Sequence, residues 1–271
     1  MDKINRINAL LEILRTSPRR VNKILLQKES GRRPAGEIVA LAKTAHIPYL
    51  FVPKAALDKL SAYHQGVVAL ISPKEFASLD EILDPGEASS SSESLEGKRP
   101  APAPASTPAH SAAAASTPIP FLLLLDEIED PQNLGAILRS AECAGVDGVI
   151  LPERRSAGLT EAVHEVSAGA LEHLKVARVA NLVQTMERLK DRGIWLVGAE
   201  SGGEGGYWEF DYTQPLGLVL GSEGKGLRPL VRKTCDKVLS IPMRGKVNSL
   251  NVASAASVFL FEVVRQRMRH L

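Results

Sequence analysis

Hydrophobic and polar positions alternate along the second half of the chain in two distinct patterns. Short apolar runs typical of buried strands lie at residues 121–125, 148–151, 176–179, 194–197, 216–220 and 238–241. Between most of them apolar residues recur every three to four positions, which predicts helices over residues 134–144, 160–173, 182–192, 227–235 and from Leu250 onward. This alternation predicts a mostly parallel sheet with helices on both faces. Such sheets bind ligands beyond the carboxyl ends of their strands, so we look for chemistry in those loops.

Residues 1–84 show the same alternation on a smaller scale. Helices are predicted over 7–14, 36–45 and 54–60, and strands over 21–26, 49–52 and 67–71. This pattern indicates a small α/β module, and nothing in it is typical of catalysis. The basic pairs Arg19-Arg20 and Arg32-Arg33 and the turn from Tyr63 to Gly66 suit contact with RNA, although solvated loops would account for them equally well.

Between these two parts, residues 85–118 consist mainly of Ser, Ala and Pro, with almost no aliphatic side chains. Such a segment cannot bury enough apolar surface to offset the entropy lost on ordering. We therefore expect a disordered linker over 85–118, between a first domain of residues 1–84 and a second of residues 119–271.

The 271-residue chain has a net charge of +2 that is unevenly distributed. Residues 223–271 and 1–85 are basic, while the stretch between them is acidic, which suits a polyanionic partner that approaches defined faces. The chain has neither a recognisable signal peptide nor an apolar run near the roughly 20 residues that cross a bilayer, so we expect a cytoplasmic protein. Two cysteines, Cys143 and Cys235, can form neither a disulfide framework nor a metal cluster, and no metal is expected.

The first candidate loop follows the apolar run 121–125. Asn133 is expected to cap the next helix, with Arg139 about a turn and a half inside it. An arginine near a strand-end crevice would offer a permanently charged, forked partner for phosphate. On spacing alone, a surface residue of an ordinary helix is the favoured interpretation of Arg139.

Two further loops carry small and polar residues. Three glycines within residues 221–226 let the backbone approach a ligand closely, and the Glu223 carboxylate among them has little packing role. Asn248, Ser249 and Asn251 gather at the start of the last predicted helix, where backbone amides are free to bind a ligand. Taken singly, the last group could be no more than a well-capped helix.

Taken together and in this order, the three loops resemble the SpoU/TrmH branch of the SPOUT superfamily, the RNA ribose 2′-O-methyltransferases. The resemblance covers roughly residues 120–269 and rests on Asn133-Leu134-Gly135 with Arg139, on Gly221-Ser222-Glu223-Gly224-Lys225-Gly226, and on Ile241-Pro242-Met243 followed by Asn248-Ser249-Leu250-Asn251-Val252. Ala253 departs from the pattern, because relatives often carry Ser there, and this affects only a local hydrogen bond. The first module, through Ile7-Asn8-Ala9 and His64-Gln65-Gly66, is similar to the RNA-binding domain of the rRNA guanosine members.

The resemblance implies an α/β fold, a mostly parallel sheet with a C-terminal trefoil knot, preceded by a small ribosomal-protein-like RNA-binding domain. It further implies an obligate homodimer that binds structured RNA and holds S-adenosylmethionine in the knot. The implied cofactor-binding residues are Gly198, Ala199, Leu220, Gly221, Ile241, Met243, Ser249 and Leu250. The implied catalytic and RNA-facing residues are Asn133, Arg139, Glu223, Ser249 and Asn251.

Methylation of a ribose requires alignment of the 2′-oxygen with the methyl group and loss of the hydroxyl proton. We expect Arg139 to lie against the target phosphate and hydroxyl, with Glu223 and Asn133 orienting it. Whether Arg139 accepts the proton or only stabilises negative charge stays open, because the pKa of a guanidinium exceeds about 12.

The extra N-terminal module favours a guanosine of large-subunit (23S) rRNA as the substrate over tRNA. A non-catalytic RNA-binding or assembly protein is the alternative of another class, and binding alone would not require Arg139, Glu223, Ser249 and Asn251 together. An ordinary nucleotide-binding α/β enzyme is disfavoured because no Gly-x-Gly-x-x-Gly loop follows the first strand of the second half.

Overall fold

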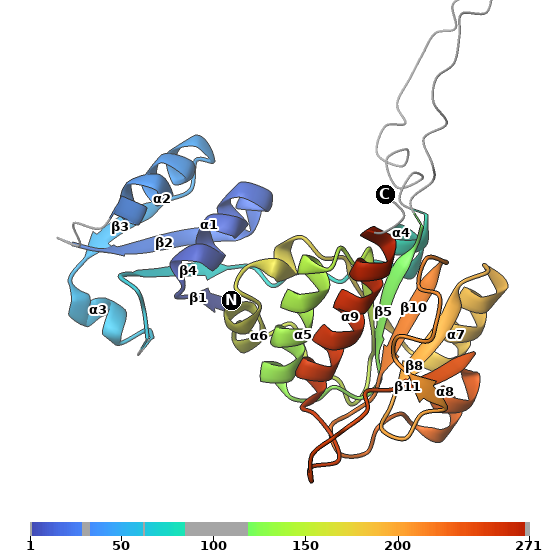
Figure 1. The fold of residues 1–271 in the computed structure, drawn as a ribbon. Helices are drawn as coiled ribbons and strands as arrows, with labels where there is room; N and C mark the ends of the chain where they lie inside the picture. Colours follow the sequence, from blue (N-terminus) through green and yellow to red (C-terminus); the bar gives the residue numbers. More distant parts are fainter. Residues whose placement is uncertain (1, 29–32, 62, 85–118, 269–271) are drawn as a thin grey trace, which may run out of the picture.

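The computed structural model describes residues 2–28, 33–61, 63–84 and 119–268. The linker expected over 85–118, and Arg32 of the second basic pair, lie outside the described residues. Figure 1 shows two α/β units side by side, a smaller one within residues 2–71 and a larger one built on residues 119–268. Each predicted strand is present, with its ends shifted by at most two residues.

The smaller unit contains a four-stranded sheet in the order β1-β4-β2-β3, in which only β2 and β3 run parallel. Its strands are β1 (Asp2–Ile4), β2 (Val21–Gln27), β3 (Tyr49–Val52) and β4 (Val67–Ile71). Its helical segments are α1 (Ile7–Thr16), η1 (Pro18–Arg20), α2 (Arg33–Thr44) and α3 (Lys54–Asp58). Apolar side chains of α1 and α2, such as Leu10 and Ile38, pack on Ile24 and Leu26 of the central strand to form its core.

The larger unit contains seven strands, all parallel over the described residues, in the order β7-β6-β5-β10-β8-β11-β9. They are β5 (Phe121–Leu125), β6 (Gly148–Pro152), β7 (Val176–Val179), β8 (Trp195–Ala199), β9 (Gly205–Gly206), β10 (Leu216–Leu220) and β11 (Lys237–Ser240). The neighbours β5 and β10 are in register from Phe121 opposite Leu216 to Leu125 opposite Leu220. Both strands are fully buried, as a central position with helices on both faces requires.

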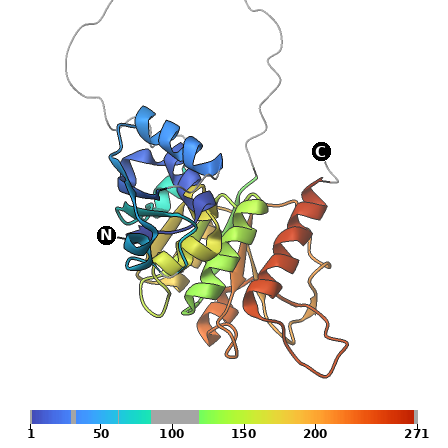
Figure 2. The same cartoon turned by 90° about the vertical axis from the view of Figure 1, so that its left-hand side faces the viewer.

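Alternate side chains of these strands belong to two separate hydrophobic cores. Leu123 and Leu218 face one helical layer, whereas Leu122 and Val219 face the other. The first layer consists of α5 (Pro131–Cys143), α6 (Glu161–Ser167), η2 (Ala170–Glu172) and α9 (Val252–Met268). The second consists of α4 (Leu79–Leu83), α7 (Leu182–Asp191) and α8 (Pro229–Thr234). Figure 2 shows α5 and α9 side by side in the first layer.

The helix predicted over 160–173 is wrong as a single element. It ends at Ser167, because Ala168 and Gly169 both adopt left-handed backbone conformations, with φ of 53° and 99°. The chain then turns into η2, whose Glu172 faces the smaller unit. The break therefore creates a contact surface between the two units.

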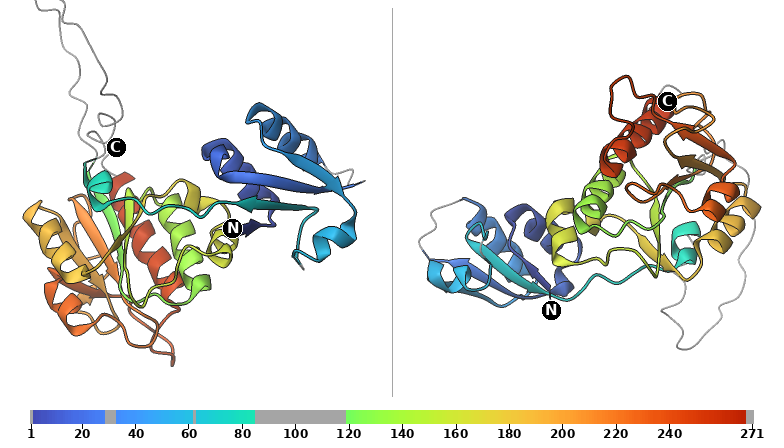
Figure 3. Two further views of the ribbon diagram at one scale, coloured as in Figure 1. Left: turned by 180° about the vertical axis from the view of Figure 1, so that it is seen from behind. Right: turned by 90° about the horizontal axis from the view of Figure 1, so that it is seen from below.

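Residues 72–84, here called the strap, connect the two units (Figure 3). Ala77 forms a parallel bridge with Ala177 on the edge strand β7, and Arg178 stacks over the Phe76 ring. Ile82 of α4 is buried, and Gly148 leaves room for it, since a Cβ there would lie 2.4 Å from the Ile82 side chain. The strap thus extends the large sheet before the chain reaches residue 85.

Three polar contacts join the units directly, and a fourth joins the strap to the larger unit. Arg20 pairs with the buried Glu172 at 2.6 Å, Arg6 pairs with Glu165 at 2.9 Å, and Glu12 contacts His173 at 2.8 Å. The Lys74 ammonium donates to the Leu171 carbonyl. Burial of Glu172 without a partner would be costly, so the Arg20 pair ties η1 firmly to η2.

Candidate functional site

The site lies where the strand order of the large sheet reverses. From β5 the chain moves outward to β6 and β7, whereas β10 enters between β5 and β8. The loops that leave β5 and β10 therefore face each other at their carboxyl ends, the position at which open α/β sheets bind ligands. They are residues 126–130 and 221–226.

Glycine at position 221 is required by the close approach of its own loop. A Cβ at Gly221 would lie 2.2 Å from the carbonyl carbon of Gly226, so any side chain would collide with backbone. Ser222 and Gly226 exchange two backbone hydrogen bonds of 3.1 and 3.0 Å. Gly224 and Gly226 have φ of 82° and 67°, which glycine adopts without strain. The loop is consequently a compact turn with its backbone open to a ligand.

A chain of side-chain hydrogen bonds joins the three predicted loops. The Asn133 amide donates to Glu223 Oε2 at 2.9 Å, and the Asn251 amide donates to Asn133 Oδ1 at 2.9 Å. Asn251 Oδ1 in turn accepts from the backbone N–H of Ala253 at 2.9 Å, which caps α9. The predicted helix start at Leu250 is therefore two residues early, because Asn251 precedes the first turn.

Asn133 is not the N-cap of α5, as the sequence suggested. Asp130 takes that position and accepts hydrogen bonds from the amides of Gln132 and Asn133, with Pro131 at the first helical position. Proline there lacks an N–H that would need a partner, and its φ suits a helix start. The Asn133 side chain is thereby released to bridge Glu223 and Asn251.

Most of the predicted cofactor residues line one cavity of about 320 Å³. They are Ala199, Leu220, Gly221, Ile241, Met243, Ser249 and Leu250, joined by Glu223 of the predicted catalytic group. Gly198 does not line it, because the α-carbon of Gly198 faces Leu227 and Cys235 in the core behind. Burial raises the pKa of the Cys235 thiol to about 12, so this thiol stays protonated near neutral pH and is no nucleophile.

A second cavity of about 230 Å³ adjoins the first and shares part of its wall. The shared residues are Ser222, Glu223, Lys225 and Val252. Glu127, Ile128, Glu129, Asp130 and Asn133 complete the second cavity. The hydrogen-bonded Asn133–Glu223 pair thus lies at the boundary of two adjoining cavities.

Among the predicted catalytic residues, Arg139 and Asn251 line neither cavity, and only Asn251 is linked to one, through its hydrogen bond to Asn133. Arg139 is exposed on α5, and within the described ranges its side chain forms no hydrogen bond or ion pair. Its neighbour Ser140 contacts Ser257 of α9 at 2.8 Å, so Arg139 lies close to the exposed side of the α5–α9 pair.

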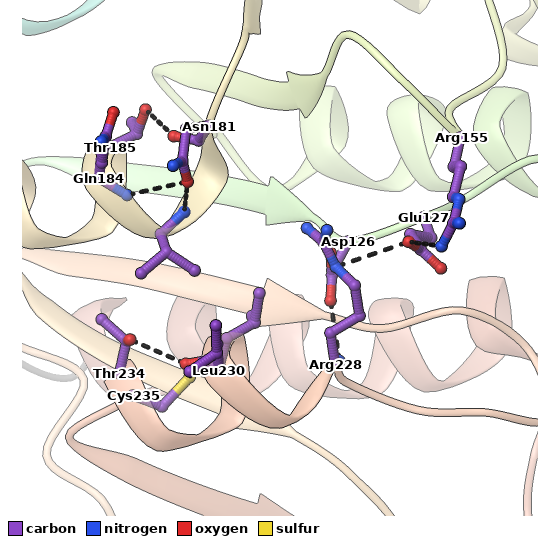
Figure 4. Close-up of polar contacts among 12 residues, drawn as sticks. Asp126, Glu127, Arg155, Asn181, Gln184, Thr185, Arg228, Leu230, Thr234 and Cys235 are labelled. Carbon is purple, nitrogen blue, oxygen red and sulfur yellow. Dashed lines mark hydrogen bonds and ion pairs between the residues drawn. The ribbon is translucent and has the colours of Figure 1, made fainter.

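Our sequence analysis did not single out four charged residues that lie beside the second cavity (Figure 4). Asp126, fully buried, accepts hydrogen bonds from the Arg228 amide at 2.9 Å and from Arg228 Nε at 2.7 Å, and this bonding raises the pKa of Arg228. Glu127 pairs with Arg155 at 3.1 Å. The Asp126-Glu127 pair directly after a buried strand and the Arg154-Arg155 pair after the next strand are the signals that could have found them.

Comparison with known proteins agrees with this geometry. Residues 120–261 match the model of the SpoU rRNA Methylase family, and residues 7–77 match that of the RNA 2′-O ribose methyltransferase substrate-binding domain. The chain belongs to the SpoU methylase family. It is an RNA ribose 2′-O-methyltransferase that uses S-adenosylmethionine.

Relatives extend over most of the chain. A Bacillus subtilis (strain 168) protein, whose name places it in the TrmH family of tRNA/rRNA methyltransferases, is 39% identical over 96% of this chain and 94% of its own length. The SpoU methyltransferase AviRb from Streptomyces viridochromogenes, solved with AdoMet, is 26% identical, with a TM-score of 0.74 over 98% of this chain and 90% of its own. A TrmH/SpoU tRNA modifying enzyme of A. aeolicus is 30% identical, with a TM-score of 0.51 over 55% of this chain and 76% of its own.

The residues present fit the family cofactor. Gly221 leaves its backbone uncovered, and apolar side chains such as Leu220, Ile241 and Leu250 can flank a flat base. Within the described ranges, no group of three or more His, Cys, Asp or Glu side chains could hold a metal ion. The same ranges contain no helix of sufficient length and apolarity to span a membrane.

Proposed function

We propose that this enzyme methylates the ribose 2′-hydroxyl of a guanosine in large-subunit rRNA. The observation that carries the proposal is the Glu223–Asn133–Asn251 chain of hydrogen bonds at the boundary of two adjoining cavities. One cavity suits the cofactor, whose sulfonium supplies an activated methyl group, and the other suits the target nucleotide. Such an rRNA methyltransferase would act in the cytoplasm.

The residue roles follow from this arrangement. Gly221, Leu220, Ile241 and Leu250 would bind the cofactor, joined by Ala199, Met243 and Ser249, with Gly198 supporting the wall from behind. Asn133 would fix the Glu223 carboxylate at the boundary of the cavities, where it can orient the ribose hydroxyl. Asn251 holds Asn133 in place and is itself held by the start of α9, so the group is organised before the reactants bind.

The preference for rRNA over tRNA rests on the smaller unit. The A. aeolicus tRNA modifying enzyme aligns with 55% of this chain, so nearly half of the chain here has no counterpart in that alignment. The smaller unit, fixed to the larger one by the Arg20–Glu172 pair, would lengthen the RNA-binding surface. A larger folded RNA can use such a surface, and tRNA is the alternative substrate.

The test is transfer of labelled methyl from S-adenosylmethionine to in-vitro-transcribed 23S rRNA and tRNA, followed by nuclease mapping. We expect label in a 2′-O-methylguanosine of the rRNA. Label confined to tRNA would refute the choice of RNA, and binding of both RNAs without any transfer would support the non-catalytic alternative.

The predicted homodimer would use the exposed side of α5 and α9. Phe261 and Met268 on α9 are exposed although apolar, and the helix has apolar residues around most of its circumference. A second copy packed there would bury them and would cover Arg139 at the same time. Within one chain Arg139 lines neither cavity, so we propose that it acts in the active site of the second protomer.

Mixed dimers test this arrangement. Arg139→Ala should abolish methyl transfer while leaving S-adenosylmethionine binding unchanged. If the sites are shared, mixing the Arg139→Ala chain with an inactive Asn133→Ala chain should restore part of the activity, because one composite site is then intact. A monomer in sedimentation experiments, or no recovery after exchange is demonstrated with tagged chains, would contradict the proposal.

We also retain the predicted C-terminal trefoil knot as part of this proposal. Residues 248–250 and 221–226 line the same cavity, and Ser201 donates a 3.0 Å hydrogen bond to the Asn248 carbonyl. These contacts bring the segment after β11 against the loops after β8 and β10, as threading of the C-terminal segment would require.

A further inference from the structure

Two facing residues beside the second cavity have a backbone conformation that their side chains do not favour. Glu127 and Arg155 have φ of 59° and 56°, and they are two of four non-glycine residues with positive φ in the described part of the chain. Such conformations are strained for residues that carry a Cβ, and they persist where the surroundings impose them. Here they direct two side chains from adjacent strand ends toward each other, to 3.1 Å.

The pair is asymmetric in its exposure to solvent. The Glu127 side chain is 10% exposed and the Arg155 side chain 71%. The carboxylate therefore holds the guanidinium from the protein side, and the only described bond of Arg155 uses Nη1. A guanidinium carries five N–H donors, so most of them face outward.

A second arginine converges on the same carboxylate. Arg228 Nε lies 3.6 Å from Glu127 Oε1, and Arg228 is held by its hydrogen bonds to Asp126 (Figure 4). The Arg228 side chain is 43% exposed, whereas Asp126 is not exposed at all. Both negative charges are thus inside and both positive charges outside, which makes this surface cationic toward an approaching RNA.

The rest of the second cavity wall carries more acidic than basic side chains. Glu129, Asp130 and Glu223 face a single lysine, Lys225, and the excess negative charge would repel a phosphodiester backbone. Forked guanidinium groups recognise phosphate oxygens in pairs and keep their charge at any working pH.

We propose that Arg155 and Arg228 form a clamp for an RNA phosphate beside the target ribose, with Glu127 as the positioning residue that aims Arg155. The inference deepens the proposed function and rests on it. The clamp would orient the strand so that the ribose enters the second cavity, and it would leave the cofactor cavity unaffected.

The experiment compares Arg155→Ala with Arg154→Ala, a matched control in the adjacent, exposed position. Binding of in-vitro-transcribed 23S rRNA is measured over a salt series, together with KM and kcat for methyl transfer and the Kd of S-adenosylmethionine. For Arg155→Ala we expect about a tenfold rise in KM, the low end for a charge-assisted hydrogen bond. We also expect the salt slope of binding to fall by about 1, with an unchanged Kd for S-adenosylmethionine. Arg154→Ala should stay within about twofold of the wild type in each quantity.

Two further variants distinguish a role of Arg155 and Glu127 in positioning the RNA from a role in stabilising the fold. Arg155→Lys should retain the salt slope while KM still rises, because the charge remains and the fork is lost. Glu127→Gln should raise KM for RNA with little change in thermal unfolding, since its amide oxygen can still accept from Arg155. Equal KM and salt slope for Arg155→Ala and Arg154→Ala would overturn the clamp. The salt slope decides this even if the wild type methylates neither RNA, an outcome that would refute the proposed function instead.

Discussion

Gly221→Ala changes the wall of the proposed cofactor cavity more directly than other single substitutions in this loop. The added methyl carbon would lie 2.2 Å from the Gly226 carbonyl carbon, 2.3 Å from its oxygen and 2.4 Å from the Leu227 nitrogen. All three are backbone atoms, so the conflict cannot be relieved by rotation of a side chain. The loop must move by about 1 Å before ordinary contact distances are restored.

The expected cost follows from this displacement. Overpacking of a tightly packed site costs about 1–3 kcal/mol. The loop that must move forms one wall of the cofactor cavity, so we assign this cost to the bound state. Such an energy weakens S-adenosylmethionine binding by about 5- to 150-fold.

Calorimetric titration with S-adenosylmethionine measures this effect without RNA. Gly224→Ala is the matched control, because the same loop carries a φ of 82° there and has open space around the α-carbon. Gly224→Ala strains the backbone without a collision, so we expect it to lose less affinity for S-adenosylmethionine than Gly221→Ala does. Binding of Gly221→Ala within twofold of the wild type would refute the collision argument.

Two further predictions concern the polar contacts. Asn133→Ala removes both hydrogen bonds that join Glu223 to Asn251. The kcat of methyl transfer should therefore fall more than tenfold, while the Kd of S-adenosylmethionine changes little. Equal losses in kcat and in cofactor affinity would contradict a positioning role for Asn133. Glu172→Gln leaves Arg20 facing a neutral amide in place of a buried carboxylate and should destabilise the contact between the units by up to about 3 kcal/mol, measured as faster proteolysis in the strap. Burial alone would raise the pKa of Glu172, but the His164 hydrogen bond and the Arg20 and Lys74 charges hold it below its usual 4.5. The Glu172 contribution is therefore complete above pH 4.5 and is lost as the pH falls through the lowered pKa, a loss that Glu172→Gln should not show in thermal unfolding.

Apolar periodicity predicted most of the fold because it reports burial directly. Strands such as 121–125 and 216–220 are buried on both faces and appear as uninterrupted apolar runs. The two-residue β9 and the five-residue α4 are too short to show a period, and tertiary contacts such as that of Ile82 with Gly148 hold α4. The break after Ser167 was missed because alanine at 168 carries no preference for a left-handed backbone.

The parts of the candidate site that lie directly after the strands could be predicted from the sequence. Loops after β5, β10 and β11 had to meet at one edge, and Asn133, Glu223 and Asn251 do meet there. The pairing of Glu127 with Arg155 was not predictable, because neither residue type favours positive φ and the two are 28 positions apart. Its cause lies in the surrounding loops, which Ile128 and Ala157 join by a 2.8 Å backbone hydrogen bond.

The path of the chain between the units bears on how RNA can be held. The strap crosses from β4 to the larger unit and adds Ala77 to the edge of its sheet, and α4 is packed against β7 before residue 85. Both flanks of the segment 85–118 therefore lie on the larger unit, and its length does not set the distance between the units. The relative position of the RNA-binding unit and the methyl-transfer site is set by the strap and by contacts such as Arg20–Glu172. Under the proposed function, an RNA that contacts both units would meet them at this fixed distance, and the smaller unit would thereby select which ribose reaches the second cavity.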